Sequence, residues 1–411
     1  MKSSIKKVFI IFIPLILFFI ACAIDPDPPS TSPTPAVDIS PSPSPTQVPI
    51  LNLVDEMDAS IVIGQVNFER YEANQGYDNP YANTLNLNYS RANIIESKLY
   101  IPDGHNHRIL IFSEIPPNHN GSADGVLGQM SFTENIGGTT KKNYYLPQAI
   151  SSNVTKLCIC DYGNNRVIIY NYIPQDGNDE ADLVVGQENF TSWSSGLAAN
   201  RLNSPEDAIL VGDKLVIADS GNNRVLIYNT IPIENDASAD IVLGQNSFET
   251  NIANDDDQDE NPDANPSART LNSPRGLWSD GNILIVSDYS NNRVLIWDPF
   301  PTSNFEEAKI VLGQPDFESN NPGSSINQLN RPYYIDVYYQ NQLFVVDYSN
   351  HRVLVWNSIP TSNGESADNY LGAGLGGPPA ATLHYPTGVC AYGDQVFVSD
   401  SRNRVLIFNS N

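Results

Sequence analysis

The chain is poor in several residue types, and each shortage excludes a class of protein. Cysteine accounts for 4 of 411 residues, so a disulfide network does not hold the fold. Lysine and arginine number 22 against 47 aspartate and glutamate residues, which gives a formal net charge of −25 at pH 7. A surface this acidic repels nucleic acid, so we expect no nucleic-acid partner. No stretch shows the apolar period of an amphipathic helix, so the fold is not helical.

Long apolar runs are also absent, apart from one at the N-terminus. Residues 8–21 read VFIIFIPLILFFIA and follow three lysines. A membrane-spanning helix needs about 20 residues, so this run predicts a secretion signal over residues 1–21. It ends in FIAC, which resembles the lipobox of bacterial lipoproteins, although Phe19 replaces the usual leucine. The resemblance implies that Cys22 carries a lipid anchor; an ordinary cleaved signal and an uncleaved anchor are the alternatives.

Residues 22–50 predict a tether. The stretch from residue 25 to residue 50 is dense in proline, serine and threonine. Such a segment cannot bury enough apolar surface to fold, and proline favours an extended spacer. We therefore expect a secreted protein, anchored in the bacterial cell envelope through Cys22. Ala23 favours the outer membrane if the host is Gram-negative, according to the lipoprotein sorting pattern.

The rest of the chain, residues 51–411, consists of three phrases that each occur six times in the same order. The first is an apolar stretch ending in Gly-Gln, as in ADIVLGQ up to Gln245, with a degenerate copy that ends at Ala373. The second is Leu-Asn-x-Pro or a relic of it, as at Leu271. The third resembles DSGNNRVLIYN, which starts at Asp219. The period of about 58 residues is close to that of a large propeller blade.

One repeat reads as four strands, which we name a to d. In the third repeat we expect strand a near residues 206–212, b near 214–219, c near 224–229 and d near 239–244. Apolar residues occupy both faces of the stretch RVLIY, which is typical of a strand covered on both sides. A blade between two neighbouring blades has this environment. The sequence therefore predicts an all-β fold, a six-bladed β-propeller with four-stranded blades.

The order of the phrases also predicts how the ring closes. The repeat region begins with a lone strand d at residues 60–64 and ends with a lone strand c at residues 404–409. Pairing the N-terminal strand d with the C-terminal strand c completes the sixth blade. It also removes exposed sheet edges.

The stretch from Leu271 to Asp298, LNSPRGLWSDGNILIVSDYSNNRVLIWD, resembles an NHL repeat. The resemblance covers roughly residues 59–411 and implies a propeller. NHL propellers include binding platforms for protein or RNA, and a lyase that uses metals. That lyase places histidines at several blades around its channel, and this sequence has no comparable set. The missing histidines argue against that lyase activity, whereas the resemblance itself is specific for the fold and weak for activity.

Loop lengths predict the position of a binding site. Five of the six motif arginines lie 20 residues before the glycine of the next apolar phrase, as from Arg224 to Gly244, so the c–d loops have constant length. The d–a loops vary, with 27 residues from Gly244 to Leu271 but 11 from Gly372 to Leu383. Function on a rigid scaffold usually resides in variable loops. We therefore expect the site around the channel mouth, on the face that carries the d–a loops and b–c hairpins. The candidate aromatic residues are Tyr71, Tyr77, Tyr81, Tyr144, Tyr145 and Trp193, for which packing between loops is the alternative role.

The hairpin phrase places one aspartate and one arginine in every blade. They are Asp103, Arg108, Asp161, Arg166, Asp219, Arg224, Asp288, Arg293, Asp347, Arg352, Asp400 and Arg404. Equal numbers of opposite charges at a repeated register indicate ion pairs, within or between blades. A ring of binding sites is the alternative. We interpret the phrase as part of the structural frame.

Metal-binding signals are weak. Asp255, Asp257 and Asp259 alternate as in some calcium loops. However, Glu260 stands where an EF-hand needs glycine, and proline stands where it needs the bidentate glutamate. A solvated acidic insertion is the preferred interpretation and calcium binding is the alternative. His351 occupies a register that is elsewhere asparagine, which favours a turn residue over a metal ligand. We expect no cofactor.

The sequence shows no nucleophile elbow, phosphate loop or zinc motif. We expect a monomeric protein that binds or scaffolds a protein or a polysaccharide at the cell envelope. The alternative is an extracellular lyase or hydrolase with its site at the channel mouth. Clustered carboxylates or histidines in the channel would favour the enzyme. Apolar side chains in the channel, with aromatics on the loop face, would favour binding.

Overall fold

The computed structural model describes residues 50–175, 179–339 and 341–410. The predicted signal peptide, Cys22 and the predicted tether up to residue 49 lie outside the described residues. The helices in the described ranges are 3₁₀ segments of three or four residues, and none has the length and apolar character needed to cross a membrane.

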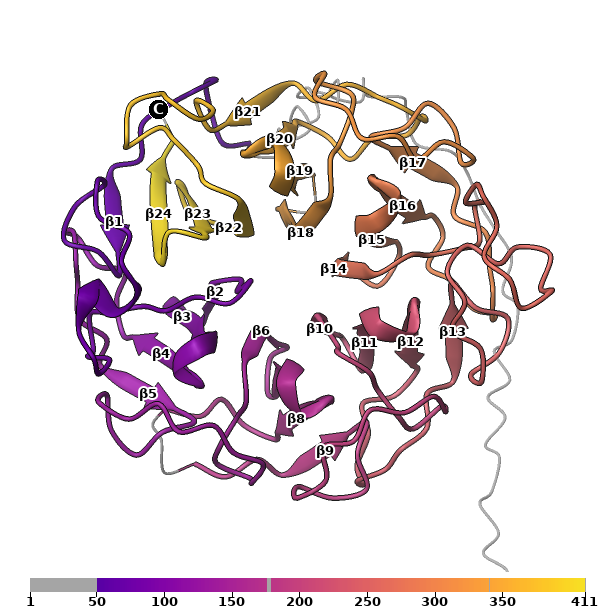
Figure 1. The fold of residues 1–411 in the computed structure, drawn as a ribbon, viewed down its shortest axis with the longest axis horizontal. Coiled ribbons are helices and arrows are strands. Elements are labelled where there is room, and N and C mark those ends of the chain that lie inside the picture. The colour runs from indigo at the N-terminus through magenta and orange to yellow at the C-terminus, as the bar shows by residue number, and fades with distance from the viewer. Residues whose placement is uncertain (1–49, 176–178, 340, 411) are drawn as a thin grey trace, which may run out of the picture. The chain divides into compact units, whose positions relative to one another are not determined.

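Six four-stranded antiparallel sheets form a ring within the unit of residues 48–411 (Figure 1). Blades 1 to 3 comprise β2 (Asn93–Ile95), β3 (Lys98–Asp103), β4 (Arg108–Phe112), β5 (Gly125–Leu127); β6 (Pro147–Ser152), β7 (Leu157–Asp161), β8 (Arg166–Tyr170), β9 (Leu183–Val185); and β10 (Asp207–Val211), β11 (Lys214–Asp219), β12 (Arg224–Tyr228), β13 (Ile241–Leu243). Blades 4 to 6 comprise β14 (Pro274–Ser279), β15 (Leu284–Asp288), β16 (Arg293–Trp297), β17 (Ile310–Leu312); β18 (Pro332–Tyr338), β19 (Gln342–Asp347), β20 (Arg352–Trp356), β21 (Asn369–Leu371); and β22 (Pro386–Tyr392), β23 (Gln395–Asp400), β24 (Arg404–Asn409), β1 (Ile61–Ile63). The predicted six-bladed, all-β propeller is confirmed.

The short 3₁₀ segments occupy loops. Segment η1 (Ala73–Gly76) lies in the first d–a loop. The b–c hairpins of blades 1 to 5 contain η2 (Gly104–Asn106), η3 (Tyr162–Asn164), η4 (Ser220–Asn222), η5 (Tyr289–Asn291) and η6 (Tyr348–Asn350). In the following, the face with these hairpins and the d–a loops is called the hairpin face. The face with the a–b turns and c–d loops is called the turn face.

The strands of blade 3 match the predicted ones, with shorter ends. Strand b is β11, with the predicted bounds. Strand d is shortened to the three residues of β13, which pair with Ile227, Leu226 and Val225 of β12. It is the outer edge of the blade and has a single neighbouring strand, so fewer of its residues stay in register.

The ring closes as predicted. Strand β1 pairs antiparallel with β24, with Ile61 opposite Ile407, Val62 opposite Leu406 and Ile63 opposite Val405. Val62 and Ile63 have no solvent-exposed surface. The sixth blade is therefore built from both ends of the repeat region.

Residues 51–56 supply a loop that blade 6 lacks, because its strands c and d are not consecutive in the sequence. In blades 3 to 5 an asparagine of the c–d loop accepts an N–H from strand d of the preceding blade: Asn235 from Val184, Asn304 from Val242, and Asn363 from Val311, at 3.0 to 3.1 Å. Asp55 does the same for the N–H of Tyr370 in β21, at 2.9 Å. These hydrogen bonds occupy N–H groups on the outer strand d, which could otherwise pair with a strand of another chain.

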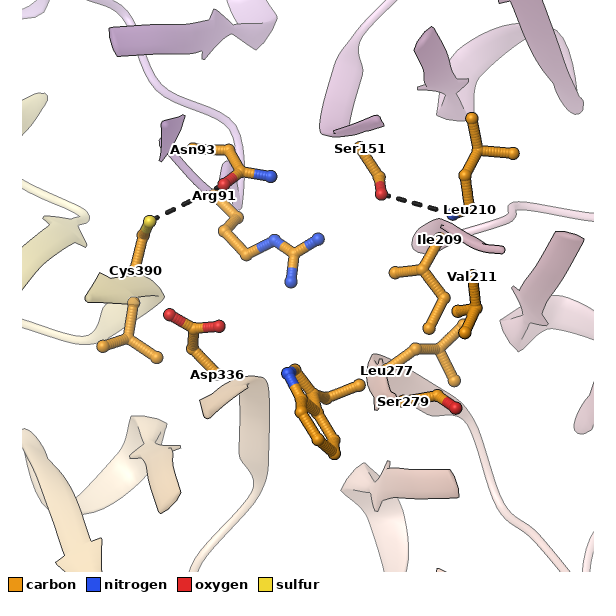
Figure 2. Close-up of a pocket in the computed structure, with 12 residues that line it drawn as sticks. Arg91, Asn93, Ser151, Ile209, Leu210, Val211, Leu277, Ser279, Asp336 and Cys390 are labelled. Atoms are coloured by element: carbon orange, nitrogen blue, oxygen red, sulfur yellow. Dashed lines mark hydrogen bonds between the residues drawn. The ribbon is translucent and has the colours of Figure 1, made fainter. Parts of the chain in front are cut away.

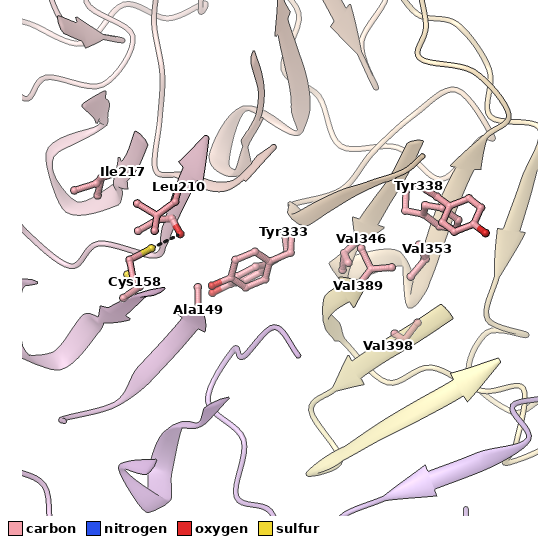
Figure 3. Close-up of a cluster of buried hydrophobic side chains, with 14 of the residues drawn as sticks. Ala149, Cys158, Leu210, Ile217, Tyr333, Tyr338, Val346, Val353, Val389 and Val398 are labelled. Atoms are coloured by element: carbon pink, nitrogen blue, oxygen red, sulfur yellow. Dashed lines mark hydrogen bonds between the residues drawn. The ribbon is translucent and has the colours of Figure 1, made fainter. Parts of the chain in front are cut away.

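The inner strands β2, β6, β10, β14, β18 and β22 surround a central channel (Figure 1). At its turn-face end they line a cavity of about 160 Å³ (Figure 2). Buried apolar clusters fill the spaces between blades. The largest spans several inner strands, and Figure 3 shows Tyr333 of β18 between Ala149 of β6 and Val346 of β19. Cys158 and Cys160 are buried and free within this cluster.

Candidate functional site

The hairpin arginines form ion pairs within their own blade. In blades 1 to 5, Nε lies 2.7 to 2.8 Å from Oδ2 of the aspartate that ends strand b. In blade 6, whose hairpin is one residue shorter, Nη2 of Arg404 lies 2.9 Å from Oδ2 of Asp400. Both partners are fully buried in every blade except blade 5, where the Arg352 side chain is 12% exposed. Of the two arrangements left open by the sequence, the structure shows the pair within the blade.

Each guanidinium also connects loops from two sides of its blade. Arg224 Nη1 donates to the carbonyl of Phe248 at 2.6 Å, in the loop that leaves blade 3. Its Nη2 donates to the carbonyls of Ala198 and Arg201 at 2.9 and 3.0 Å, in the loop that enters the blade. The phenylalanine belongs to a recurring stretch, Gly-Gln-x-x-Phe. Blade 5 is followed by the degenerate copy, which has no such phenylalanine, and this explains the exposure of Arg352.

Burial raises the pKa of Asp219, and the Arg224 guanidinium opposes that rise. Oδ1 of Asp219 accepts the N–H of Asn203 at 2.7 Å, and Asn222 donates to Oδ2 at 2.8 Å. The carboxylate is therefore saturated by protein donors and has no room for a ligand. This geometry supports the interpretation of the repeated phrase as frame.

One residue in every hairpin links its blade to the next. These residues are His107, Asn165, Asn223, Asn292, His351 and Asn403, with φ between 50° and 58°. Each accepts a backbone N–H from the d–a segment that precedes the next blade, through Oδ1 of asparagine or Nδ1 of histidine, at 2.7 to 3.2 Å. Both side chains offer an acceptor at the same place, which explains why histidine and asparagine interchange. His107 and His351 are thus turn residues.

These two histidines make stability depend on pH. Burial lowers the pKa of His107 and of His351 below the ordinary value, and a neighbouring histidine, His105 or His384, lowers each of them further. The unfolded chain therefore takes up protons first, and the stabilisation is complete above about pH 6.5 and is lost as the pH falls toward the lowered folded-state values. We expect the free energy of urea unfolding to depend less on pH between pH 6.5 and pH 5 in the double variant His107→Asn, His351→Asn. It should depend more on pH in Asn223→His. The same slope against pH in both variants and in the unsubstituted protein would contradict this expectation.

The predicted binding aromatics fall into different environments. Tyr71, Tyr77, Tyr81 and Trp193 are exposed by 43 to 61%. The rings of Tyr77 and Tyr81 meet edge to face at 5.3 Å, whereas Trp193 lies two d–a loops further along the chain. The six residues therefore do not form one surface.

The two remaining candidates are packing residues to different degrees. Tyr144 is fully buried, and its hydroxyl hydrogen-bonds that of Tyr170 at 2.7 Å. It thus belongs to the core between blades 1 and 2 and is not available to a partner in solution. Tyr145 stacks on His107 at 4.9 Å and keeps 44% of its surface exposed.

A different aromatic group lies where the hairpin face meets the channel. This mouth cluster consists of Tyr89, Tyr289, Tyr333, Tyr348 and Tyr385, around Arg275. Tyr89 stacks on Tyr333 at 5.6 Å with an interplanar angle of 9°, and Tyr289 and Tyr348 contact the same ring. Arg275 lies 4.0 Å from the ring centre of Tyr289 and 4.4 Å from that of Tyr333.

The mouth cluster borders a cavity of about 430 Å³, lined in part by Tyr89, His105 and Tyr348. Tyr89 and Tyr385 are 43% and 37% exposed. The sequence analysis missed this group, although Tyr289 and Tyr348 both directly follow a hairpin aspartate. The signal was tyrosine at this position in three of the six hairpins, the third being Tyr162.

Below the mouth, buried charges and tyrosines fill the channel. Glu206, Arg275 and Tyr333 each follow the proline of the Leu-Asn-x-Pro motif, in three successive blades. Arg275 Nη1 lies 3.0 Å from Glu206 Oε1, and the Tyr333 hydroxyl donates to Oε2 at 2.9 Å. Burial raises the pKa of Glu206, and Arg275 opposes the rise.

Ala149, Asp207, Gly276, Tyr334 and Gly388 lie two residues after the motif proline, and Arg91 takes the corresponding place in blade 1, where the segment is one residue longer. These six residues are called the upper ring. Arg91 Nη2 lies 3.3 Å from Asp207 Oδ1, and its guanidinium is 5.2 Å from the centre of the Tyr334 ring. A Cβ on Gly388 would lie 2.6 Å from Cα of Arg91, so glycine is required opposite the large side chain. Above the cavity at its turn-face end, the channel is filled by tyrosines and ion pairs, and Glu206 and Asp207 in this filled part each have an arginine partner. The sequence predicted either apolar side chains or clustered carboxylates and histidines in the channel, and the residues that the structure describes there show neither of these.

The acidic loop brings together a different set of carboxylates from the predicted one. Asp255, Asp257 and Asp263 have oxygens within 4.8 Å of one another, and in the described residues no other three such side chains meet in this way. The third candidate, Asp259, instead donates its backbone N–H to Asp255 at 3.1 Å, while its carboxylate accepts the N–H of Asn261. The solvated acidic insertion stays the prediction for this loop, with calcium binding as its alternative.

A scan against protein-family models finds no match for this sequence, and a search of curated proteins finds none either. Solved structures do match. A streptogramin B lyase is 12% identical over 78% of this chain and 93% of that chain, with a TM-score of 0.41. The WD40 β-propeller domain of Doa1 is 12% identical over 89% and 97%, with a TM-score of 0.44, and virginiamycin B lyase from Staphylococcus aureus is 15% identical over 80% and 94%, with a TM-score of 0.40. At these values the similarity extends neither ligand nor activity to this chain.

Proposed function

We propose that this protein is a binding or scaffolding propeller of the bacterial cell envelope, which recognises a protein or a polysaccharide through its hairpin face. The observation that carries the proposal is the mouth cluster. Five tyrosines from four blades converge on one place, and two of them are more than one-third exposed. Tyrosine offers a large, rigid surface that stacks on sugars or anchors a protein partner.

The place where the chain joins the propeller supports this choice of face. The backbone of Leu51 and the side chain of Gln342 exchange two hydrogen bonds, at 2.8 and 3.0 Å. Gln342 begins β19 at the turn face, and Asn52 bonds Ser410 at the end of β24 on the same side. The N-terminal segment therefore enters at the turn face. Residues 51 and 52 thus lie against the turn face and do not cover the hairpin face.

The state of the channel favours binding over catalysis. Glu206 and Asp207 are each held by an arginine and by further hydrogen bonds, so neither is poised to exchange a proton with a substrate. The acidic composition continues to disfavour a nucleic-acid partner.

Affinity capture tests the proposal. The full-length protein would be used to capture components of envelope extracts, separated into protein and polysaccharide fractions. We expect Tyr89→Ala combined with Tyr385→Ala to weaken capture tenfold or more, because central aromatic residues dominate interface energies. The matched control is Tyr172→Ala with Tyr392→Ala, two tyrosines of similar exposure on the turn face. Equal capture by both double variants would overturn the proposal.

A further inference from the structure

The cavity at the turn-face end of the channel is built from residues that do not repeat. Its wall includes six residues that we call the lower ring, one from each inner strand. Each of them pairs, on strand b, with the residue three positions before the hairpin aspartate. The ring comprises Asn93, Ser151, Ile209, Trp278, Asp336 and Cys390. The hairpin positions in the same repeats hold aspartate and arginine six times out of six. The lower ring holds six different residue types at one register, so the cavity is asymmetric. Residues that only hold the repeated frame together would be expected to repeat, as the hairpin residues do.

Arg91 extends into this cavity from above and is incompletely paired. Its side chain is 7% exposed. Nη2 lies 3.3 Å from Asp207, Nη1 lies 3.4 Å from the carbonyl of Ile335, and Nε has no hydrogen-bond partner. Both contacts are longer than the 2.7 to 2.9 Å typical of charge-assisted hydrogen bonds. The guanidinium can therefore accommodate a further acceptor.

Asp336 faces the same space with an opposite charge. Figure 2 shows its carboxylate and the Arg91 guanidinium pointing into the cavity from neighbouring positions. Oδ2 accepts the N–H of Ala391 at 2.7 Å. Among the described residues no lysine, arginine or histidine nitrogen lies within 4.0 Å of this carboxylate. Burial raises its pKa, and the hydrogen bond from Ala391 and the nearby Arg91 guanidinium oppose the rise.

Across the cavity from Arg91 and Asp336, Ile209 and Leu277 form an apolar part of the wall, with the side chains of Ser151 and Ser279 beside it (Figure 2). Trp278 also lines the cavity. The cavity therefore offers a cation, an anion and an apolar surface at once. A volume of about 160 Å³ corresponds to roughly five water molecules, which suits a small molecule and excludes a polymer.

We propose that this cavity binds a small zwitterion, an apolar α-amino acid, whose carboxylate contacts Arg91 and whose ammonium group contacts Asp336. The apolar side chain lies against Ile209, Leu277 and Trp278. A simple amine would satisfy Asp336 but would face the Arg91 guanidinium. A simple carboxylate would satisfy Arg91 but would face Asp336 and Asp207. Only a molecule with both charges complements both groups, and this site is separate from the hairpin-face function.

Titration calorimetry on the full-length protein tests this inference, with L-leucine and L-valine as probes. We expect saturable binding of at least one of them. L-Leucinamide, which lacks the carboxylate, and 4-methylpentanoate, which lacks the ammonium group, should each bind at least tenfold more weakly than L-leucine. No saturable heat with either amino acid, or equal binding of leucinamide or 4-methylpentanoate, would overturn the proposal.

A substitution assigns the site. Asp336→Asn keeps the shape of the side chain and should weaken amino-acid binding at least tenfold. Asp213→Asn, on an exposed turn of the same face, should leave it unchanged. If Asp336→Asn does not fold, the unsubstituted protein provides the second readout. Amino-acid binding should change tryptophan fluorescence, and Trp278→Phe should abolish that change; a change that persists in Trp278→Phe would contradict binding in this cavity.

Discussion

Replacing Arg224 by alanine should cost about 3–5 kcal/mol of unfolding free energy, the range for breaking a buried ion pair by removing one partner. Asp219 would remain fully buried without its cation. The carbonyls of Phe248, Ala198 and Arg201 would lose the guanidinium donor at the same time. The substitution thus leaves a buried carboxylate without its cation and removes the hydrogen bonds that join two loops.

Urea unfolding of two comparison variants checks this expectation. Arg269→Ala removes a surface ion pair with Glu307, in which both side chains are about half exposed, and should cost less than about 1 kcal/mol. Arg352→Ala should fall between the two, because Arg352 is partly exposed and has no phenylalanine carbonyl to hold. A cost for Arg224→Ala as small as that for Arg269→Ala would show that the repeated phrase is not the frame.

Replacing Val62 by aspartate should prevent the ring from closing. Val62 has no exposed surface and pairs with Leu406 in the middle of the β1–β24 ladder. A carboxylate there would be buried without a cation, which costs several kcal/mol before any loss of packing. Detachment of β1 would also expose the edge of β24, which favours aggregation. We expect soluble yield to fall sharply and any soluble fraction to unfold at low urea.

The control for this substitution is Val66→Asp, four residues later, where the side chain is 48% exposed. It introduces the same charge without burying it, so yield and urea midpoint should stay close to those of the unsubstituted chain. If Val62→Asp behaved like Val66→Asp, the pairing of β1 with β24 would not hold the ring together.

The sequence was sufficient to predict the frame because the frame repeats. Six copies of a phrase reveal which positions share an environment, and the lone strand at each end of the repeat region implies the pairing of β1 with β24. The cap that Asp55 places on Tyr370 of β21 was harder to predict. It performs the role of the c–d asparagines with a different residue type, before the first recognisable strand.

Residues that converge across blades could not be predicted in the same way. Tyr89, Tyr289 and Tyr333 are far apart in the sequence, and their contacts depend on the radius of the ring and on side-chain direction. Tyr144 was misplaced for a related reason: it lies in a variable loop, but its ring turns inward and hydrogen-bonds Tyr170. The acidic loop likewise selects Asp263 over Asp259, because the chain folds back on itself between them.

The central claim is that the repeated hairpins are frame and that recognition belongs to the non-repeating residues at the channel mouth. Its most direct test measures urea stability and envelope capture together, for Arg224→Ala and for the double variant Tyr89→Ala, Tyr385→Ala. Arg224→Ala should lose stability while its folded fraction captures as well as the unsubstituted protein. The tyrosine variant should keep its stability and lose capture. The reverse pattern, with capture lost in folded Arg224→Ala and retained in the tyrosine variant, would contradict the claim and assign recognition to the hairpin ring.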